Sequence, residues 1–135
     1  MILVDAGPLV ALIHRGDDNH ERCRIAFRSV REPMGTVWPA LTEAMYLLTS
    51  SWKAQDALWE MTEAGVLELL PLSKDDAPRM RELMKKYRDL PMDLADAALV
   101  RAAERHRIAR IFTLDRTDFE IYRPRSIGRF SILPD

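Results

Sequence analysis

The stretch "ILVDAGPLVALIH", residues 2–14, shows a strand followed directly by a helix, and strands and helices alternate along the rest of the chain. Ile2–Val4 is a short apolar run of the kind that forms a buried strand. Asp5 follows this run directly, and Pro8 is tolerated in the first turn of a helix that we expect to run to about His14. A strand that passes at once into a helix favours an α/β protein.

The same alternation continues to the end of the sequence. Further strands are predicted at residues 35–38, 66–72, 110–114 and 130–133. Helices are predicted at about residues 17–30, 39–48, 53–64, 76–88 and 93–107, with Asp17 or Asp18 as the N-cap of the first of these. Alternating strands and helices indicate a mostly parallel central sheet that is covered on both faces. We therefore expect one three-layer α/β/α domain over residues 1–135.

The composition is that of an ordinary globular protein, with 47% hydrophobic and 30% charged residues. Cys23 is the one cysteine, so an intrachain disulfide is impossible and a reducing interior suits the chain. Asp5 interrupts the apolar N-terminal stretch, and no basic segment precedes it, which argues against a signal peptide. No apolar run approaches the roughly 18 residues of a membrane span. These features predict a cytoplasmic location.

The net charge of −1 provides no overall positive field for binding nucleic acid. Residues 1–97 carry 12 basic and 16 acidic side chains, whereas residues 98–135 carry 8 and 5. Sixteen of the 20 basic residues are arginines, which bind phosphate well but serve equally well on a solvated surface. The sequence has no glycine-rich phosphate loop, no HExxH or Cys/His metal motif and no GxSxG motif. Chemistry that depends on those motifs is therefore not indicated.

Acidic residues recur just beyond the predicted strands. They are Asp5, Glu43, Asp96, Asp115 and Asp118. Ligands of open parallel sheets bind beyond the carboxyl ends of the strands, and all these acids can approach that edge. Crowded carboxylates raise one another's pKa unless a cation lies among them. Because Mg²⁺ and Mn²⁺ take oxygen ligands, the pattern favours a site for one of these ions.

Local structural roles are an alternative explanation for several of these acids. Asp93 is well suited to be the N-cap of the helix at 93–107, and Asp96 would then lie in its first turn, where the helix dipole favours a carboxylate. Glu43 has the same alternative in its own helix, and Asp115 could begin a turn. Asp5 is harder to explain in this way, because a carboxylate beside a buried strand is costly without a partner.

Four segments in series resemble the PIN-domain family, and within it the VapC-type toxin ribonucleases. They are "ILVDAGPLVAL" (2–12), "PALTEAMYLL" (39–48), "LPMDLADAALVRAA" (90–103) and "IFTLDRTDF" (111–119). The resemblance spans nearly the whole chain in the right order. It implies a PIN-like α/β/α fold and an endoribonuclease that depends on Mg²⁺ or Mn²⁺. It also implies a homodimer and a cognate VapB-type antitoxin that covers the site.

The resemblance assigns roles to individual residues. The three core acids match Asp5, Glu43 and Asp96, and the fourth, variable position matches Asp115. Further candidates are Asp93, Asp118 and the hydroxyl of Thr113. Ala6 departs from the family, which commonly has Ser or Thr directly after the first aspartate.

The hypothesis is hydrolysis of RNA phosphodiesters by a metal-activated water, with Asp5, Glu43, Asp96 and Asp115 as metal ligands. Arg116 and, more weakly, Arg101 are candidate contacts to RNA phosphate. The main alternative, which Ala6 suggests, is a catalytically inactive PIN-like domain that binds RNA or a protein partner. A receiver-like signalling domain is disfavoured, because no aspartate ends the strand at 66–72 and no lysine follows 110–114.

Overall fold

Five parallel strands form a single sheet in the order β3–β2–β1–β4–β5 in the computed structural model, which describes residues 1–135. The strands are β1 (Ile2–Val4), β2 (Met34–Thr36), β3 (Leu67–Leu69), β4 (Arg110–Phe112) and β5 (Ser131–Leu133). The central strand is β1, in which Leu3 is in register with Gly35 of β2 and Ile111 of β4. The expected sheet is confirmed, and every pairing in it is parallel.

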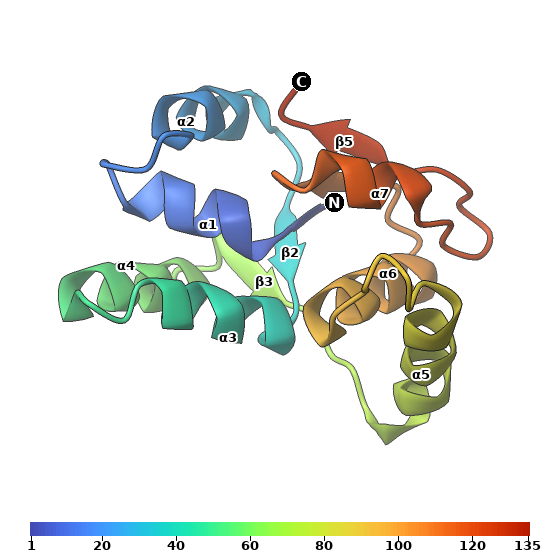
Figure 1. Cartoon of the computed structure of the whole chain (residues 1–135). Helices are drawn as coiled ribbons and strands as arrows, with labels where there is room; N and C mark the ends of the chain where they lie inside the picture. Colours follow the sequence, from blue (N-terminus) through green and yellow to red (C-terminus); the bar gives the residue numbers. More distant parts are fainter.

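Helices cover both faces of the sheet. They are α1 (Ala6–Ile13), α2 (His20–Ser29), α3 (Trp38–Leu47), α4 (Trp52–Glu63), α5 (Ala77–Lys86), α6 (Leu94–His106) and α7 (Arg116–Ile121), and a short 3₁₀ helix, η1 (Lys74–Asp76), precedes α5. Figure 1 shows α1 to α4 gathered on one side and α5 to α7 on the other. No helix is both long enough and apolar enough to span a membrane.

The pleat of the strands divides the apolar core in two. Ile2 and Val4 pack with α1, α2 and α4, whereas Leu3, between them in the sequence, packs with α5, α6 and α7. Adjacent residues of a strand point to opposite faces, so a run that is apolar throughout is required when both faces are covered. The buried run that begins the sequence is therefore explained by the position of β1 at the centre of the sheet.

Several predicted boundaries differ from the structure. β1 has the predicted bounds, the other four strands are shorter than expected, and α7 and η1 were not anticipated. The prediction that Asp17 or Asp18 caps α2 is wrong: Asn19 is the N-cap and has no capping side-chain bond, while Asp17 accepts a hydrogen bond from the Asn19 N–H at 2.8 Å. Asp17 therefore stabilises a turn before the helix.

The order of the strands creates a switch point beside β1. The chain leaves β1 for β2 and β3 on one side, then crosses to β4 and β5 on the other. The carboxyl ends of β1 and β4 consequently lie side by side while their following helices, α1 and α7, diverge to opposite faces. Ligands of open α/β sheets bind at such a point.

Candidate active site

Asp5 lies where β1 passes into α1 and is almost completely buried. It is the N-cap of α1, and its Oδ1 accepts a hydrogen bond from the Ala6 N–H at 2.8 Å. Its other oxygen, Oδ2, accepts a 2.8 Å bond from the hydroxyl of Thr113, which directly follows β4. The carboxylate is thus held at the switch point by the residues that follow β1 and β4.

Thr113 links the first acid to the fourth. Its Oγ1 also accepts a hydrogen bond from the Asp115 N–H at 3.0 Å, so that Asp115, Thr113 and Asp5 form a continuous chain of hydrogen bonds. The hydroxyl that Ala6 cannot provide is therefore supplied to Asp5 by another strand end. This placement agrees with the candidate role of Thr113.

Asp93 and Asp96 have the different roles that their spacing indicates. Asp93 is the N-cap of α6, and its Oδ1 accepts a 2.8 Å bond from the Asp96 N–H. The side chain of Asp96 is buried, and its Oδ2 accepts a 2.7 Å bond from the phenol of Tyr122. Tyr122 follows α7 and packs edge-on against Phe119 and Tyr87, with ring centroids 5.0 Å apart in each pair.

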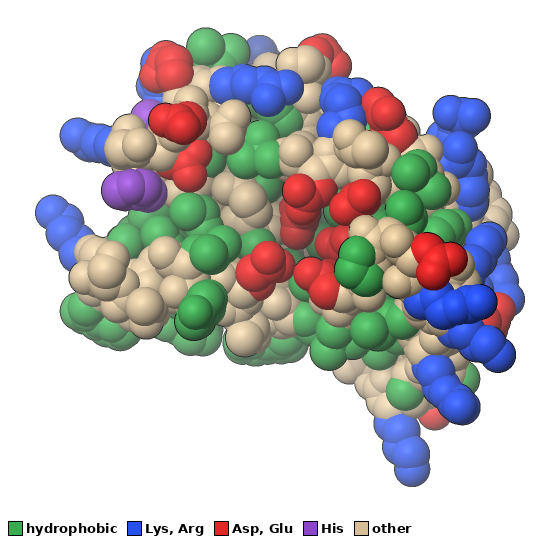
Figure 2. All heavy atoms as spheres, in the orientation of Figure 1, with side chains coloured by type: hydrophobic (Ala, Val, Ile, Leu, Met, Phe, Trp, Pro, Cys, Tyr) green, Lys and Arg blue, Asp and Glu red, His purple; other side chains and the backbone are tan.

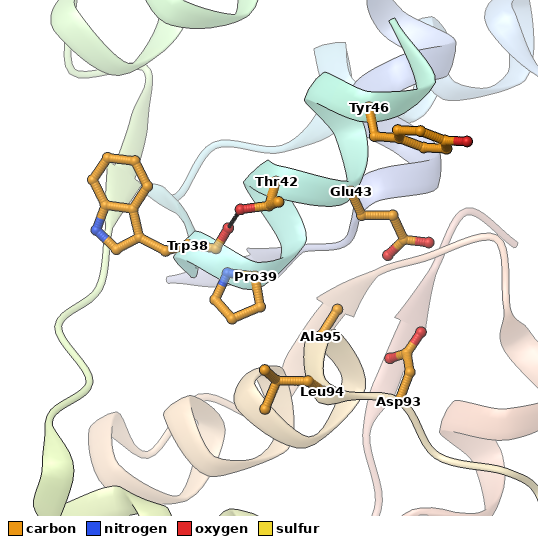
Figure 3. Close-up of a pocket in the computed structure, with 8 residues that line it drawn as sticks. All are labelled: Trp38, Pro39, Thr42, Glu43, Tyr46, Asp93, Leu94 and Ala95. Carbon is orange, nitrogen blue, oxygen red and sulfur yellow. Dashed lines mark hydrogen bonds between the residues drawn. The ribbon is translucent and has the colours of Figure 1, made fainter. Parts of the chain in front are cut away.

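The remaining acids are more accessible. Glu43 is exposed on α3, and its carboxylate faces that of Asp93 on α6 (Figure 3). Asp115 is exposed at the start of α7, and Asp118 lies half-buried further along it. Figure 2 shows acidic side chains gathered in the middle of this face, while lysine and arginine side chains lie toward its edges.

No positive side chain neutralises this group, which we call the acidic cluster. Its members are Asp5, Glu43, Asp93, Asp96, Asp115 and Asp118, and none of them takes part in an ion pair. Burial raises the pKa of Asp5 to about 6, although the Thr113 and Ala6 hydrogen bonds oppose it, and the charges of Asp115 and Glu43 raise it further. Buried carboxylates with strongly raised pKa values cluster at functional sites, so this group is a functional-site candidate.

The pKa of Asp96 is raised more than that of Asp5. Burial raises its pKa to about 8 against the lowering effect of the Tyr122 hydrogen bond, and the charges of Asp5, Asp93 and Asp115 add to the rise. Burial, and then the neighbouring acids, also raise the pKa values of Glu43 and Asp115. Each acid therefore makes the ionisation of the others less favourable.

The chemistry of the donors fits a hard divalent cation. Every side chain of the cluster offers carboxylate oxygen, the ligand that Mg²⁺ and Mn²⁺ prefer, and a cation would relieve the mutual repulsion. No group of three or more His, Cys, Asp or Glu side chains, however, converges closely enough to form a ready metal site. The acids are gathered at one edge of the sheet without closing around a single point.

The two arginines suggested as phosphate contacts donate hydrogen bonds to other groups of the protein. Arg116 donates to the carbonyl oxygens of Ile132 and Pro134 at 3.1 and 2.9 Å. Arg101 donates to the buried Asp76 at 2.7 Å. Both guanidinium groups are therefore engaged in holding the fold together.

Two features of the site have no counterpart in the sequence patterns. The Tyr122 hydrogen bond to Asp96 joins residues 26 positions apart, and no motif marks it. The second feature is a groove of about 640 Å³ beside Glu43 and Asp93, which is also lined by Trp38, Pro39, Thr42, Tyr46, Leu94 and Ala95 (Figure 3). The spacing of Glu43 and Tyr46, three residues apart on one helix, is a signal that could have revealed part of this groove.

Comparisons with known proteins agree with the arrangement. The family model of the PIN domain matches residues 2–123. Ribonuclease VapC26 from Mycobacterium tuberculosis is 27% identical over 135 residues, covering 98% of this chain and 100% of that protein.

Solved structures show the same fold. Mycobacterium tuberculosis VapC20, described as a toxin that cleaves the sarcin–ricin loop, superposes with a TM-score of 0.79 at 20% identity, covering 87% of this chain and 94% of that chain. VapBC2 from Rickettsia felis, solved with a DNA fragment of its promoter, superposes with a TM-score of 0.66 at 14% identity, covering 99% of this chain and 100% of that chain.

Proposed function

The chain belongs to the PIN-domain family, and from this premise we propose that it is a divalent-metal-dependent endoribonuclease, the toxin of a VapBC-type toxin–antitoxin pair. The observation that carries the proposal is the acidic cluster at the switch point, where the buried Asp5 and Asp96 have no cationic partner. Retaining such a cluster is costly unless it serves a ligand. The likeness to Ribonuclease VapC26 supports RNA as the substrate.

Asp5, Glu43, Asp96 and Asp115 are the proposed ligands of Mg²⁺ or Mn²⁺. When bound, such an ion lowers the pKa of a water molecule and stabilises the negative charge that develops on the phosphate. Thr113 and Tyr122 each donate one hydrogen bond, to Asp5 and Asp96 respectively, and so fix the direction of the two buried carboxylates. A bound cation would favour the charged forms of Asp5 and Asp96, whose pKa values are raised in its absence.

Glu43 is the proposed general base. It is exposed, and its raised pKa makes it a better proton acceptor than an ordinary glutamate. Its carboxylate points toward Asp93 across the entrance to the groove, where a water molecule could lie between the protein and a phosphodiester (Figure 3). No nucleophilic side chain is needed for this reaction.

Partners follow from the same proposal. A cognate VapB-type antitoxin would cover the acidic cluster, in line with the toxin–antitoxin complexes among the structural neighbours. We further propose that the protein is a homodimer. We also propose that it acts in the cytoplasm, where its RNA substrate and its antitoxin would be found. The alternative is an inactive PIN-like domain, which the missing hydroxyl at Ala6 suggests, although Asp5 does accept a hydroxyl hydrogen bond from Thr113.

Cleavage of total cellular RNA by the purified chain, freed of any bound partner, tests the proposal. The reaction is run with Mg²⁺, with Mn²⁺ and with EDTA, beside the variant Asp96→Asn. Asp75→Asn, which removes an exposed acid outside the cluster, is the matched control. We expect discrete fragments that need metal, persist in the control and vanish with Asp96→Asn. If folded, metal-treated protein leaves the RNA intact, the inactive alternative is the better description.

A further inference from the structure

The groove contains one accessible aromatic ring, that of Tyr46, at its end beside the acidic cluster. Tyr46 is 74% exposed and lies one helical turn after Glu43 on α3. Figure 3 shows its ring extending to the same side of α3 as the carboxylate of Glu43. Trp38, at the other end of the groove, points away from the acids and packs against Trp59, with ring centroids 6.3 Å apart.

Apart from the acids, the groove is lined by apolar and aromatic side chains and by Thr42, whose hydroxyl already donates to the Trp38 carbonyl oxygen at 2.8 Å. Pro39, Leu94 and Ala95 line it with Tyr46, and none of its lining residues is a lysine or arginine. A phosphate would find no positive partner here. An uncharged, flat, partly apolar group such as a nucleobase suits these walls, because every base can stack on an aromatic ring.

We propose that Tyr46 is a stacking platform for a nucleobase of single-stranded RNA, in a nucleotide next to the phosphodiester held at the acidic cluster. The inference rests on the proposed ribonuclease function and adds a base-binding subsite to it. Residues three apart on a helix lie on the same face, so a base stacked on Tyr46 and a phosphate near Glu43 are neighbours along one strand.

The position of the acids favours the substrate over a second copy of the chain as the occupant. Glu43 and Asp93 both line the groove, and their carboxylates face each other (Figure 3). A subunit seated permanently against Tyr46 would cover those carboxylates, which the reaction needs accessible. A base of the substrate reaches the groove together with the phosphate that the acids act on.

The proposal is tested by RNA binding in the Asp96→Asn background, where turnover is prevented and the cluster is less repulsive to RNA. The probes are a fluorescently labelled 12-nucleotide oligouridylate and the same chain with stable abasic sugars in place of its bases. Tyr46→Ala is compared with Tyr46→Phe, which keeps the ring, and with Trp52→Ala, which removes another exposed aromatic outside the groove.

We expect Tyr46→Ala to weaken binding of the base-bearing chain by about 5- to 150-fold, the range of one stacked base. Tyr46→Phe and Trp52→Ala should bind like the parent. The abasic chain should bind the Tyr46→Ala protein and the parent equally, because neither can make the stack.

Three results would overturn the subsite. Tyr46→Ala could leave binding unchanged, or it could weaken binding of the abasic chain by the same factor. It could also reduce the oligomeric state, measured by light scattering, when Trp52→Ala does not, which would make the groove a subunit interface. The proposed function fails separately, and the subsite with it, if the Asp96→Asn protein binds neither chain and the unmodified protein cleaves no RNA.

Discussion

At the scale of single residues, the site depends on two hydroxyl groups. Thr113 donates to Asp5 and Tyr122 donates to Asp96, each from a segment remote in sequence. Each carboxylate is buried, so its orientation is fixed by these bonds and not by solvent. Loss of a hydrogen-bond partner behind a metal ligand typically lowers metal affinity or activity about 10- to 100-fold.

Tyr122→Phe is therefore expected to weaken Mn²⁺ binding about 10- to 100-fold. The variant removes the donor to Asp96 and keeps the ring that packs against Phe119 and Tyr87. Titration calorimetry with Mn²⁺ measures the effect. Tyr87→Phe is the control, because the Tyr87 hydroxyl accepts a bond from the Arg123 N–H and touches no acid. Equal Mn²⁺ affinity in the two variants would remove Tyr122 from the site.

Asp96→Asn should stabilise the metal-free protein at neutral and alkaline pH. The folded-state pKa of Asp96 is about 8, against an ordinary value of 3.8. Between these values the folded state binds a proton that the unfolded state lacks, so stability falls as the pH rises from about 4 to 8. Asparagine removes this loss while its side-chain oxygen can still accept from Tyr122.

The gain in unfolding free energy should be roughly 2–4 kcal/mol at pH 8 and should shrink toward pH 4. Urea denaturation in EDTA at several pH values measures it. A gain that is the same at every pH would show that the carboxyl group is not perturbed in this way.

At the scale of elements, helix starts place the acids. Asp5 begins α1 and Asp93 begins α6, and each side chain accepts a hydrogen bond from an N–H of the first turn. Such caps satisfy donors that the helix itself leaves free. They also fix where the first turn points, so that the cap at Asp93 determines the direction of Asp96.

Asp93→Ala should lower the unfolding free energy by up to about 1 kcal/mol, through loss of the cap of α6. Asp93→Asn separates this effect from charge, because asparagine caps as well as aspartate but removes one carboxylate from the cluster. We expect Asp93→Asn to be at least as stable as the parent, and both variants to retain some Mn²⁺ binding. Urea denaturation distinguishes them; if Asn and Ala destabilise equally, the cap contributes nothing measurable.

At the scale of the whole molecule, an ion-pair network joins the start of α5 to α6. Asp76 is fully buried and accepts bonds from the Ser73 N–H at 2.8 Å and from Arg101 and Arg105 at 2.7 Å each. Burial by itself would raise the pKa of Asp76, but the Ser73 N–H and the two arginines outweigh it and lower the pKa to about 2. The network holds α6, and with it Asp96, in place.

Lowering the pH should weaken the ion pairs of Asp76 over a defined pH range. Because the folded-state pKa of Asp76 is about 2, its contribution is complete above the ordinary value of 3.8 and is lost as the pH falls through about 2. We expect a loss of the order of 2 kcal/mol over this range, reduced by the partial exposure of both arginines. The unfolding free energy of Asp76→Asn should be lower at pH 7 and should fall less between pH 4 and 2. Parallel pH curves for the two proteins would contradict the role of Asp76.

The local pattern of the sequence predicted much of this molecule. Apolar runs indicated the strands, helical periodicity indicated the major helices, and the spacing of Asp93 and Asp96 indicated the cap of α6. These predictions succeed because they depend on residues within one or two turns of each other. The positions of the acids relative to the strands also predicted that they gather at one edge of the sheet, since parallel strands end at a common edge.

Only the tertiary structure decided which segments meet. The short α7 was not expected, the donors to Asp5 and Asp96 come from distant parts of the chain, and Arg116 and Arg101 bind partners that their sequence neighbourhood does not suggest. The groove beside Tyr46 likewise exists because α3 and the start of α6 lie together. Such contacts depend on the order of the strands, β3–β2–β1–β4–β5, which brings β1 beside β4. The sequence by itself determined the acids and the elements that carry them, and the packing of remote segments determined how those acids are held, because only packing selects their hydrogen-bond partners.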